Sequence, residues 1–117
     1  MKLNQVAAAL HLHPLTPELT DREQVEISRA HVSDLLSDVL ANAPAGGMLL
    51  TIQVHLNVIA VALHAVQAAV IFTSGMVPEE AVIARAIEEN MPLFATEEST
   101  FDAAGKLYAL GVRGRHE

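Results

Sequence analysis

The chain has 117 residues, of which 51% are hydrophobic and 18% are charged. This is enough for one domain with a hydrophobic core, and it excludes a disordered chain. The formal net charge is −7, with fourteen acidic and seven basic residues. We therefore expect no nucleic-acid partner and no membrane partner, because both require basic surfaces. Cysteine is absent, which excludes disulfides and thiol chemistry and predicts a cytoplasmic protein.

The first third of the chain predicts short elements. Residues 3–10 favour a helix, and the loose alternation over residues 25–32 predicts a strand. Ser33 is interpreted as the N-cap of a helix that ends near Asn42, with Asp34 in its first turn, where a carboxylate favours the helix dipole. The predicted apolar stripe of this helix contains Leu35, Leu36, Val39 and Leu40.

The centre of the chain alternates between strands and helices. Strands buried on both faces are predicted at residues 48–54 and 68–73, with a helix at residues 57–66 between them. Pro78 is interpreted as the first residue of the next helix, where its missing N–H is tolerated. A short strand is predicted at residues 92–95.

A last helix is predicted between Ser99, its N-cap, and Gly111, its stop signal. The alternation of strands and helices along the chain predicts a single α/β domain over residues 1–117. We expect three layers, with a mostly parallel sheet of about four to five strands and helices on both faces.

Polar side chains occur where the two central strands end. In open α/β sheets, ligands bind beyond the carboxyl ends of the strands. The candidate ligand-binding residues are therefore Thr51, Gln53, His55, Asn57, Thr73, Ser74 and Gly75. His55 lies at a strand–helix junction, and it either contacts a ligand or fixes the turn through hydrogen bonds. Both interpretations stay open at the level of sequence.

Motifs of catalysis are absent from the sequence. The pair Gly46–Gly47 precedes a strand, so it is neither a P-loop nor a dinucleotide motif. His11 and His13 could share one face of a strand and hold a metal, but no third ligand lies nearby, and two surface histidines are the preferred interpretation. We therefore predict no catalytic residue, no metal and no cofactor.

Three blocks of the sequence resemble the DRTGG domain family: HVSDLLSDVLANA, TIQVHLNVIAVA and FATEESTFDAAGKLYALGV. The resemblance is most specific over residues 32–112. The motif that names the family is only partly present, because its Thr-Gly-Gly segment resembles Ser28–Arg29–Ala30 in this chain. The resemblance indicates candidate interface or motif-loop residues, namely Ser28, Arg29, Ala30, His31, Ser33 and Asp34.

The resemblance implies an α/β fold, a homodimer and a regulatory role next to nucleotide-sensing modules. It also implies a stand-alone protein that accompanies iron-only hydrogenase or electron-transfer genes. Our first hypothesis is a non-catalytic regulatory or accessory homodimer that serves a hydrogenase or electron-transfer protein. The alternative is a sensor that binds an adenine nucleotide or another anion at the strand ends. An enzyme that uses His55 as a base is the least favoured hypothesis.

Overall fold

The computed structural model describes residues 1–114, and the last three residues of the predicted domain lie outside the described part. In chain order the elements are α1 (Leu3–Ala9), β1 (His13–Pro14), the 3₁₀ helix η1 (Thr20–Arg22), β2 (Ala30–Val32), α2 (Leu36–Asn42), β3 (Met48–Thr51), α3 (Asn57–His64), β4 (Ala69–Phe72), α4 (Glu80–Glu88), β5 (Leu93–Ala95) and α5 (Thr100–Ala109). The sheet has the order β1-β5-β4-β3-β2. Strand β1 is antiparallel to β5, and the other neighbouring pairs are parallel.

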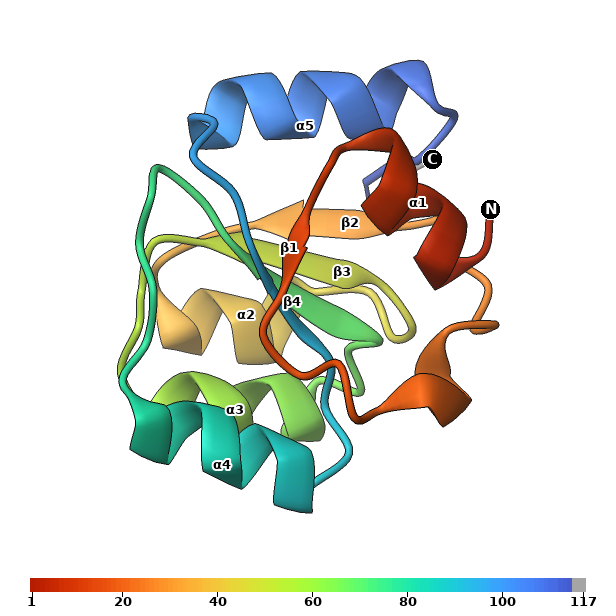
Figure 1. Ribbon diagram of the computed structural model, residues 1–117. Helices are drawn as coiled ribbons and strands as arrows, with labels where there is room; N and C mark the ends of the chain where they lie inside the picture. Colours follow the sequence, from red (N-terminus) through yellow and green to blue (C-terminus); the bar gives the residue numbers. More distant parts are fainter. Residues whose placement is uncertain (115–117) are drawn as a thin grey trace.

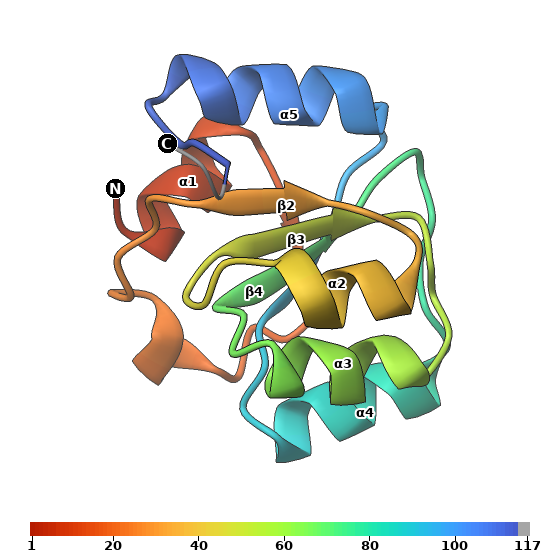
Figure 2. The same ribbon diagram turned by 180° about the vertical axis from the view of Figure 1, so that it is seen from behind.

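Helices cover both faces of the sheet. Helices α1 and α5 lie on one face, and α2, α3 and α4 lie on the other (Figure 1, and from behind in Figure 2). Strand β4 is buried on both sides: Ala69 and Ile71 pack in the core beneath α1 and α5, whereas Val70 and Phe72 pack in the core above α2, α3 and α4. A continuous apolar run is typical of a parallel strand covered on both faces. The predicted three-layer α/β fold is confirmed.

Helix α2 begins later than predicted. Its N-cap position is Leu35, and the hydroxyl oxygen of Ser33 accepts a hydrogen bond from the Leu35 N–H at 3.2 Å in a local turn. The predictions of Ser33 as the N-cap and of Asp34 in the first turn are therefore wrong. The physical reason is a long-range contact, because the Asp34 carboxylate binds the loop that follows β3. No local pattern signals such a contact.

The predicted apolar stripe of α2 is only partly buried. Val39 is fully buried and Leu36 packs partly against the core. Leu35 and Leu40 are 65% and 52% exposed. Because α2 starts at Leu36, Leu35 precedes the helix and is not carried onto its inner face.

Other element predictions also differ from the structure, and the strand predicted at residues 48–54 ends at Thr51. The strand predicted at residues 25–32 is limited to its last three residues, and the edge strand β1 was not predicted. Strand β1 contains Pro14, which is tolerated there because β1 lies at the edge of the sheet. Pro78 precedes Glu79, the N-cap of α4, so its predicted place inside that helix is wrong. Each helix within residues 1–114 is too short or too polar to cross a lipid bilayer.

Candidate functional site

The predicted threonines lie side by side at the centre of the carboxyl edge of the sheet. The Thr73 N–H donates to the Thr51 carbonyl oxygen at 3.1 Å, and both residues are buried. The Thr73 hydroxyl forms a 2.5 Å hydrogen bond with the hydroxyl of Thr100 in α5. The Thr51 hydroxyl donates to Asp34 Oδ1 at 2.8 Å. Both hydroxyls therefore connect the strand ends to neighbouring elements.

The residues between β3 and α3 form a series of local turns. The Gln53 N–H donates to Thr51 Oγ1 at 3.0 Å, the His55 N–H donates to Gln53 Oε1 at 3.2 Å, and the Asn57 N–H donates to His55 Nδ1 at 3.0 Å. Each side chain thus accepts from the backbone N–H two residues further on, which is a typical role of polar residues in turns. The hydrogen-bonding interpretation of His55 accounts for its Nδ1 atom, while its ring is exposed.

A different pair of strands forms the crevice that the topology favours. The chain leaves β4 toward α4 on one face of the sheet, and it leaves β5 toward α5 on the opposite face (Figures 1 and 2). Ligands in open α/β sheets bind where neighbouring connections diverge in this way. The candidate site therefore lies between the carboxyl ends of β4 and β5.

A cavity of about 360 Å³ lies at this position. It is lined by Leu10, His11, His13, Gly75, Val77, Ala95, Thr96, Glu97 and Glu98. Antiparallel pairing places His13 opposite Ala95. As a result, His11 and His13 line the same cavity as Glu97 and Glu98. The sequence analysis weighed the histidines as a metal pair and preferred two surface histidines, and it missed Glu97 and Glu98 as site residues. No local signal links segments so far apart in the chain.

The predicted turn residues Ser74 and Gly75 lie at this crevice, but their backbone donors are occupied. The Ser74 N–H donates to the Glu98 carbonyl at 2.7 Å, and the Gly75 N–H donates to the Thr96 carbonyl at 3.0 Å. Gly75 has φ +75°, and a Cβ atom there would lie 2.8 Å from Glu97 Oε2. Only glycine fits this position without strain. The turn therefore extends the β4–β5 ladder and does not present free N–H groups to a phosphate.

Charge in the cavity disfavours anions. Glu97 is exposed, and the carboxylate of Glu98 forms an ion pair with the Lys106 ammonium group. Lysine and arginine are absent from the residues that line the cavity. Within the described residues, no group of three or more histidine and acidic side chains is placed to hold a metal ion. The cavity therefore suits neutral or cationic polar groups that donate hydrogen bonds.

The predicted motif-loop residues hold the β2 edge together. The Arg113 N–H donates to the Ser28 carbonyl at 3.1 Å, the Ala30 N–H donates to the Arg113 carbonyl at 2.9 Å, and the Met48 N–H donates to the Arg29 carbonyl at 3.0 Å. These backbone groups join β2 to β3 on one side and to the C-terminal segment on the other. Within residues 1–114, these backbone groups extend the hydrogen-bonding of the sheet at this edge.

His31 and Asp38 join β2 to α2. His31 Nε2 lies 2.8 Å from Asp38 Oδ2, and the Asn42 amide donates to Asp38 Oδ1 at 2.7 Å. Hydrogen bonds from Asn42, then from His31 and Ser33, lower the pKa of Asp38 to about 2. His31 and Ser33 thus stabilise the local structure around α2.

These features define a three-layer α/β domain with a cavity where the connections of two parallel strands diverge. Residues 55–110 match the sequence model of the DRTGG domain. The resemblance found in the sequence is thereby confirmed. Its first block, which contains His31, lies before the matched residues. No curated protein matches the sequence significantly.

The fold is similar to a solved structure described as the CBS and DRTGG domains of the regulatory region of Clostridium perfringens pyrophosphatase, complexed with the activator diadenosine tetraphosphate. The TM-score is 0.74 at 15% sequence identity. The match covers 91% of this chain and 45% of the other, so this chain corresponds to less than half of that regulatory region. At this identity the similarity establishes the fold.

Proposed function

We propose that the chain is a regulatory module that senses a small ligand in the crevice between β4 and β5, and that it is not an enzyme. The observation that carries the proposal is the cavity of about 360 Å³ at the point where the connections of these strands diverge. The similar Clostridium structure is a regulatory region in complex with an adenine-nucleotide activator. We therefore propose an adenine nucleotide as the ligand.

The charge of the cavity determines how a nucleotide would bind. An adenine amino group or a ribose hydroxyl can donate hydrogen bonds to Glu97, and imidazole rings can stack on a base. Phosphates would extend away from Glu97, because like charges repel. The proposed contacts are His13, Thr96 and Glu97, next to the predicted residues Ser74 and Gly75.

Two hypotheses from the sequence concern the neighbouring loop. Gln53, His55 and Asn57 remain a second candidate surface for the ligand, because His55 and Asn57 are exposed and Gln53 is partly exposed. An enzyme with His55 as its base is the least favoured hypothesis, since Nδ1 already accepts the Asn57 N–H. Nucleotide turnover that disappears in His55→Gln would revive it.

A thermal-shift screen tests the proposal, with adenosine, AMP, ADP, ATP and diadenosine tetraphosphate as the probes. We expect a saturable rise in melting temperature for at least one probe. Glu97→Gln and His13→Ala should reduce this rise. The matched controls Glu18→Gln and His64→Ala should keep it, because Glu18 and His64 are exposed and lie outside the cavity. If no probe raises the melting temperature of the folded protein, adenine-nucleotide sensing is rejected.

The same pattern of variants separates the two candidate surfaces. A nucleotide-induced shift that is lost in His55→Ala but kept in Glu97→Gln would move the ligand from the crevice to the turn after β3. Loss in Glu97→Gln alone would support the crevice. Both substituted side chains are exposed, so we expect both variants to fold.

We further propose that the module acts as a homodimer. The support is the number of large apolar side chains at the surface, which include Leu35, Val66 and Phe101 at 65%, 63% and 85% exposure. Sedimentation equilibrium over a micromolar concentration range tests this, and a pure monomer throughout would reject it. A hydrogenase or electron-transfer partner and a cytoplasmic location stay predictions of the resemblance and the composition.

A further inference from the structure

Helix α5 carries apolar side chains on both of its faces. Ala103 and Leu107 are buried against the sheet. On the outer face, Phe101 is 85% exposed and Tyr108 is 57% exposed. The whole chain contains three phenylalanines and one tyrosine, so half of its aromatic residues project into solvent from one helix. Residues seven apart lie on the same side of a helix, and aromatic residues are enriched at the centres of protein interfaces.

Gly105 lies between the two aromatic residues, in the interior of the helix. Glycine lowers helix stability relative to alanine. Crowding within the described chain does not explain its presence, because a Cβ atom at Gly105 would have no neighbour within 4 Å. A shallow groove passes over this position and is also lined by Phe101, Asp102, Lys106 and Ala109. An external element that approaches the helix backbone closely would use the missing side chain.

We propose that this outer face of α5 binds the same face of a second copy of the chain, with the two helices antiparallel across a twofold axis near Gly105. The inference rests on the homodimer proposed above and locates its interface. In this arrangement each Phe101 faces the second copy's Ala109, so a large side chain meets a small one at both ends. The contact is self-complementary, as a twofold interface requires.

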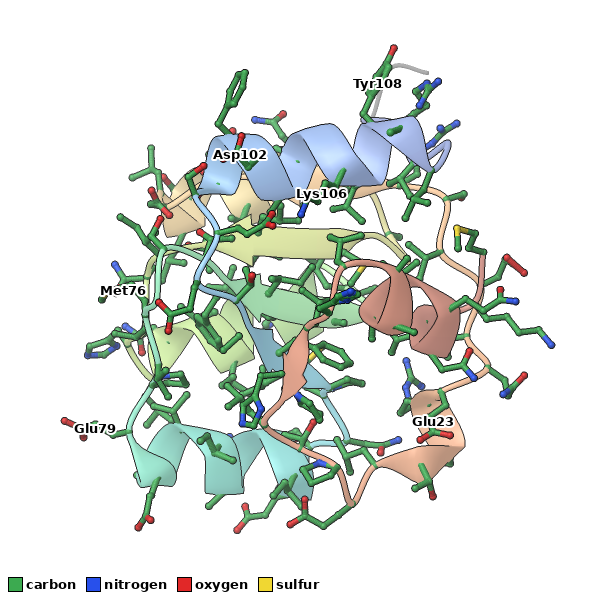
Figure 3. The ribbon with its side chains drawn as sticks, turned by 45° about the horizontal axis from the view of Figure 1, so that its top comes forward. Glu23, Met76, Glu79, Asp102, Lys106 and Tyr108 are labelled. Atoms are coloured by element: carbon green, nitrogen blue, oxygen red, sulfur yellow. The ribbon has the colours of Figure 1, made fainter. Side chains whose placement is uncertain are left out.

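Charge supports the antiparallel arrangement. The Arg113 guanidinium lies 3.7 Å from the centre of the Tyr108 ring, which places a cation at one end of the outer face. Asp102 lies near the other end of the helix (Figure 3). An axis through Gly105 brings Asp102 of each copy opposite Tyr108 and Arg113 of the other. A parallel arrangement would instead place like charges next to each other.

The length of the helix limits the strength of the contact. Ten residues span about 15 Å, which is short for a standard interface of roughly 800 Å² per partner. We therefore expect a dimer that dissociates on dilution within the micromolar range. Both a rise and a fall in the dimer Kd can be measured in this range, and the exposed side chains can be changed without disturbing the core.

Sedimentation equilibrium of the full chain and its variants tests the inference. Phe101→Ala should raise the dimer Kd about tenfold, as truncation of an interface anchor typically does. Phe101→Asp and Gly105→Leu should leave a folded monomer, because the first places a charge at each end of the contact and the second places a bulky group on the axis. Leu40→Asp is the matched control, since Leu40 is 52% exposed on α2 in the opposite layer, and it should keep the dimer.

Gly105→Ala gives an independent readout. Added helix propensity should raise its melting temperature at a concentration where the chain is monomeric, whereas the dimer Kd should rise at least threefold. A merely structural glycine would leave the Kd unchanged, and that result would overturn the inference. A dimer that survives Phe101→Asp but dissociates in Leu40→Asp would also overturn it and would place the interface at α2.

Failure of this inference is distinguishable from failure of the proposed sensing function. A wild-type chain that stays monomeric at every concentration would reject the α5 interface together with the homodimer. The nucleotide-induced thermal shift is measured separately on Phe101→Asp, whose side chain does not line the β4–β5 cavity. A shift in that monomer would leave ligand sensing intact.

Discussion

Substitution of Asp34 by alanine should destabilise the domain strongly, although Asp34 lies at the surface. Its Oδ1 atom accepts two hydrogen bonds at 2.8 Å, from the Thr51 hydroxyl and from the Ile52 N–H. Hydrogen bonds to a charged group contribute about 1.5–3 kcal/mol each. Water can replace the carboxylate at the exposed Ile52, so the bond to the Ile52 N–H contributes only in part, whereas the bond to the Thr51 hydroxyl contributes fully. We therefore expect Asp34→Ala to lower the free energy of unfolding by about 2–3 kcal/mol.

The loss is measured by urea unfolding and by thermal unfolding, both followed by circular dichroism. For a chain of this length, each 1 kcal/mol lowers the melting temperature by roughly 3–5 °C, so Asp34→Ala should melt roughly 6–15 °C lower. Asp34→Asn keeps an oxygen acceptor without the charge and should lose about 1 kcal/mol. Glu18→Ala is the control, because Glu18 is exposed, and it should change stability by less than about 0.5 kcal/mol.

A double-mutant cycle identifies the source of the effect. If Asp34 acts through the buried Thr51 hydroxyl, Asp34→Ala should cost less in a Thr51→Val background than in the wild type, by about 1 kcal/mol or more. Additive losses would show that the two residues do not interact. A loss of less than about 0.5 kcal/mol in Asp34→Ala would refute the reasoning, because the bridge between the loops after β2 and β3 would then be energetically irrelevant.

Three further predictions concern other contacts. Hydrogen bonds lower the pKa of Asp38 from its ordinary value of 3.8 to about 2, and the largest contribution comes from Asn42. The ionised carboxylate therefore stabilises the fold above about pH 4. That contribution is lost as pH falls toward 2, and Asn42→Ala should raise the pKa in a carboxyl NMR titration. Gly75→Ala should destabilise by more than about 1 kcal/mol in urea unfolding, because its φ is positive. Thr73→Val should lose about 1 kcal/mol with the Thr100 hydrogen bond, whereas unchanged stability would contradict that role.

The layers of the fold could be predicted because their signals are local. The apolar runs at β3 and β4 are buried on both faces, and such runs are typical of a parallel sheet covered on both sides. Ser99 was predicted correctly as a cap, and its hydroxyl oxygen accepts the Asp102 N–H at 3.1 Å. Ser33 resembles Ser99 in sequence, but its role was decided by the tertiary contact of its neighbour Asp34.

The crevice could not be predicted because it depends on pairing between distant segments. Strand β1 has two residues, which is too short to show any periodicity. Its pairing with β5 nevertheless brings His13 next to the loop that contains Glu97. The predicted region around His55 was correct as a strand–helix junction, since local polar residues signal a turn. The order of the strands in the sheet determines at which strand–helix junction the neighbouring connections diverge. This order cannot be inferred from single residues.

The two proposed surfaces share one structural connection, and this connection has a thermodynamic consequence. Glu98 lines the cavity between β4 and β5, and its carboxylate pairs with Lys106 of α5, which borders the groove over Gly105. A ligand that competes for Glu98 would release Lys106 beside the proposed dimer contact. If ligand binding changes the dimer Kd, dimerisation must change ligand affinity by the same factor. Lys106→Met should remove this coupling while it leaves each binding event measurable, and equal nucleotide affinity in monomer and dimer would show that the two surfaces act independently.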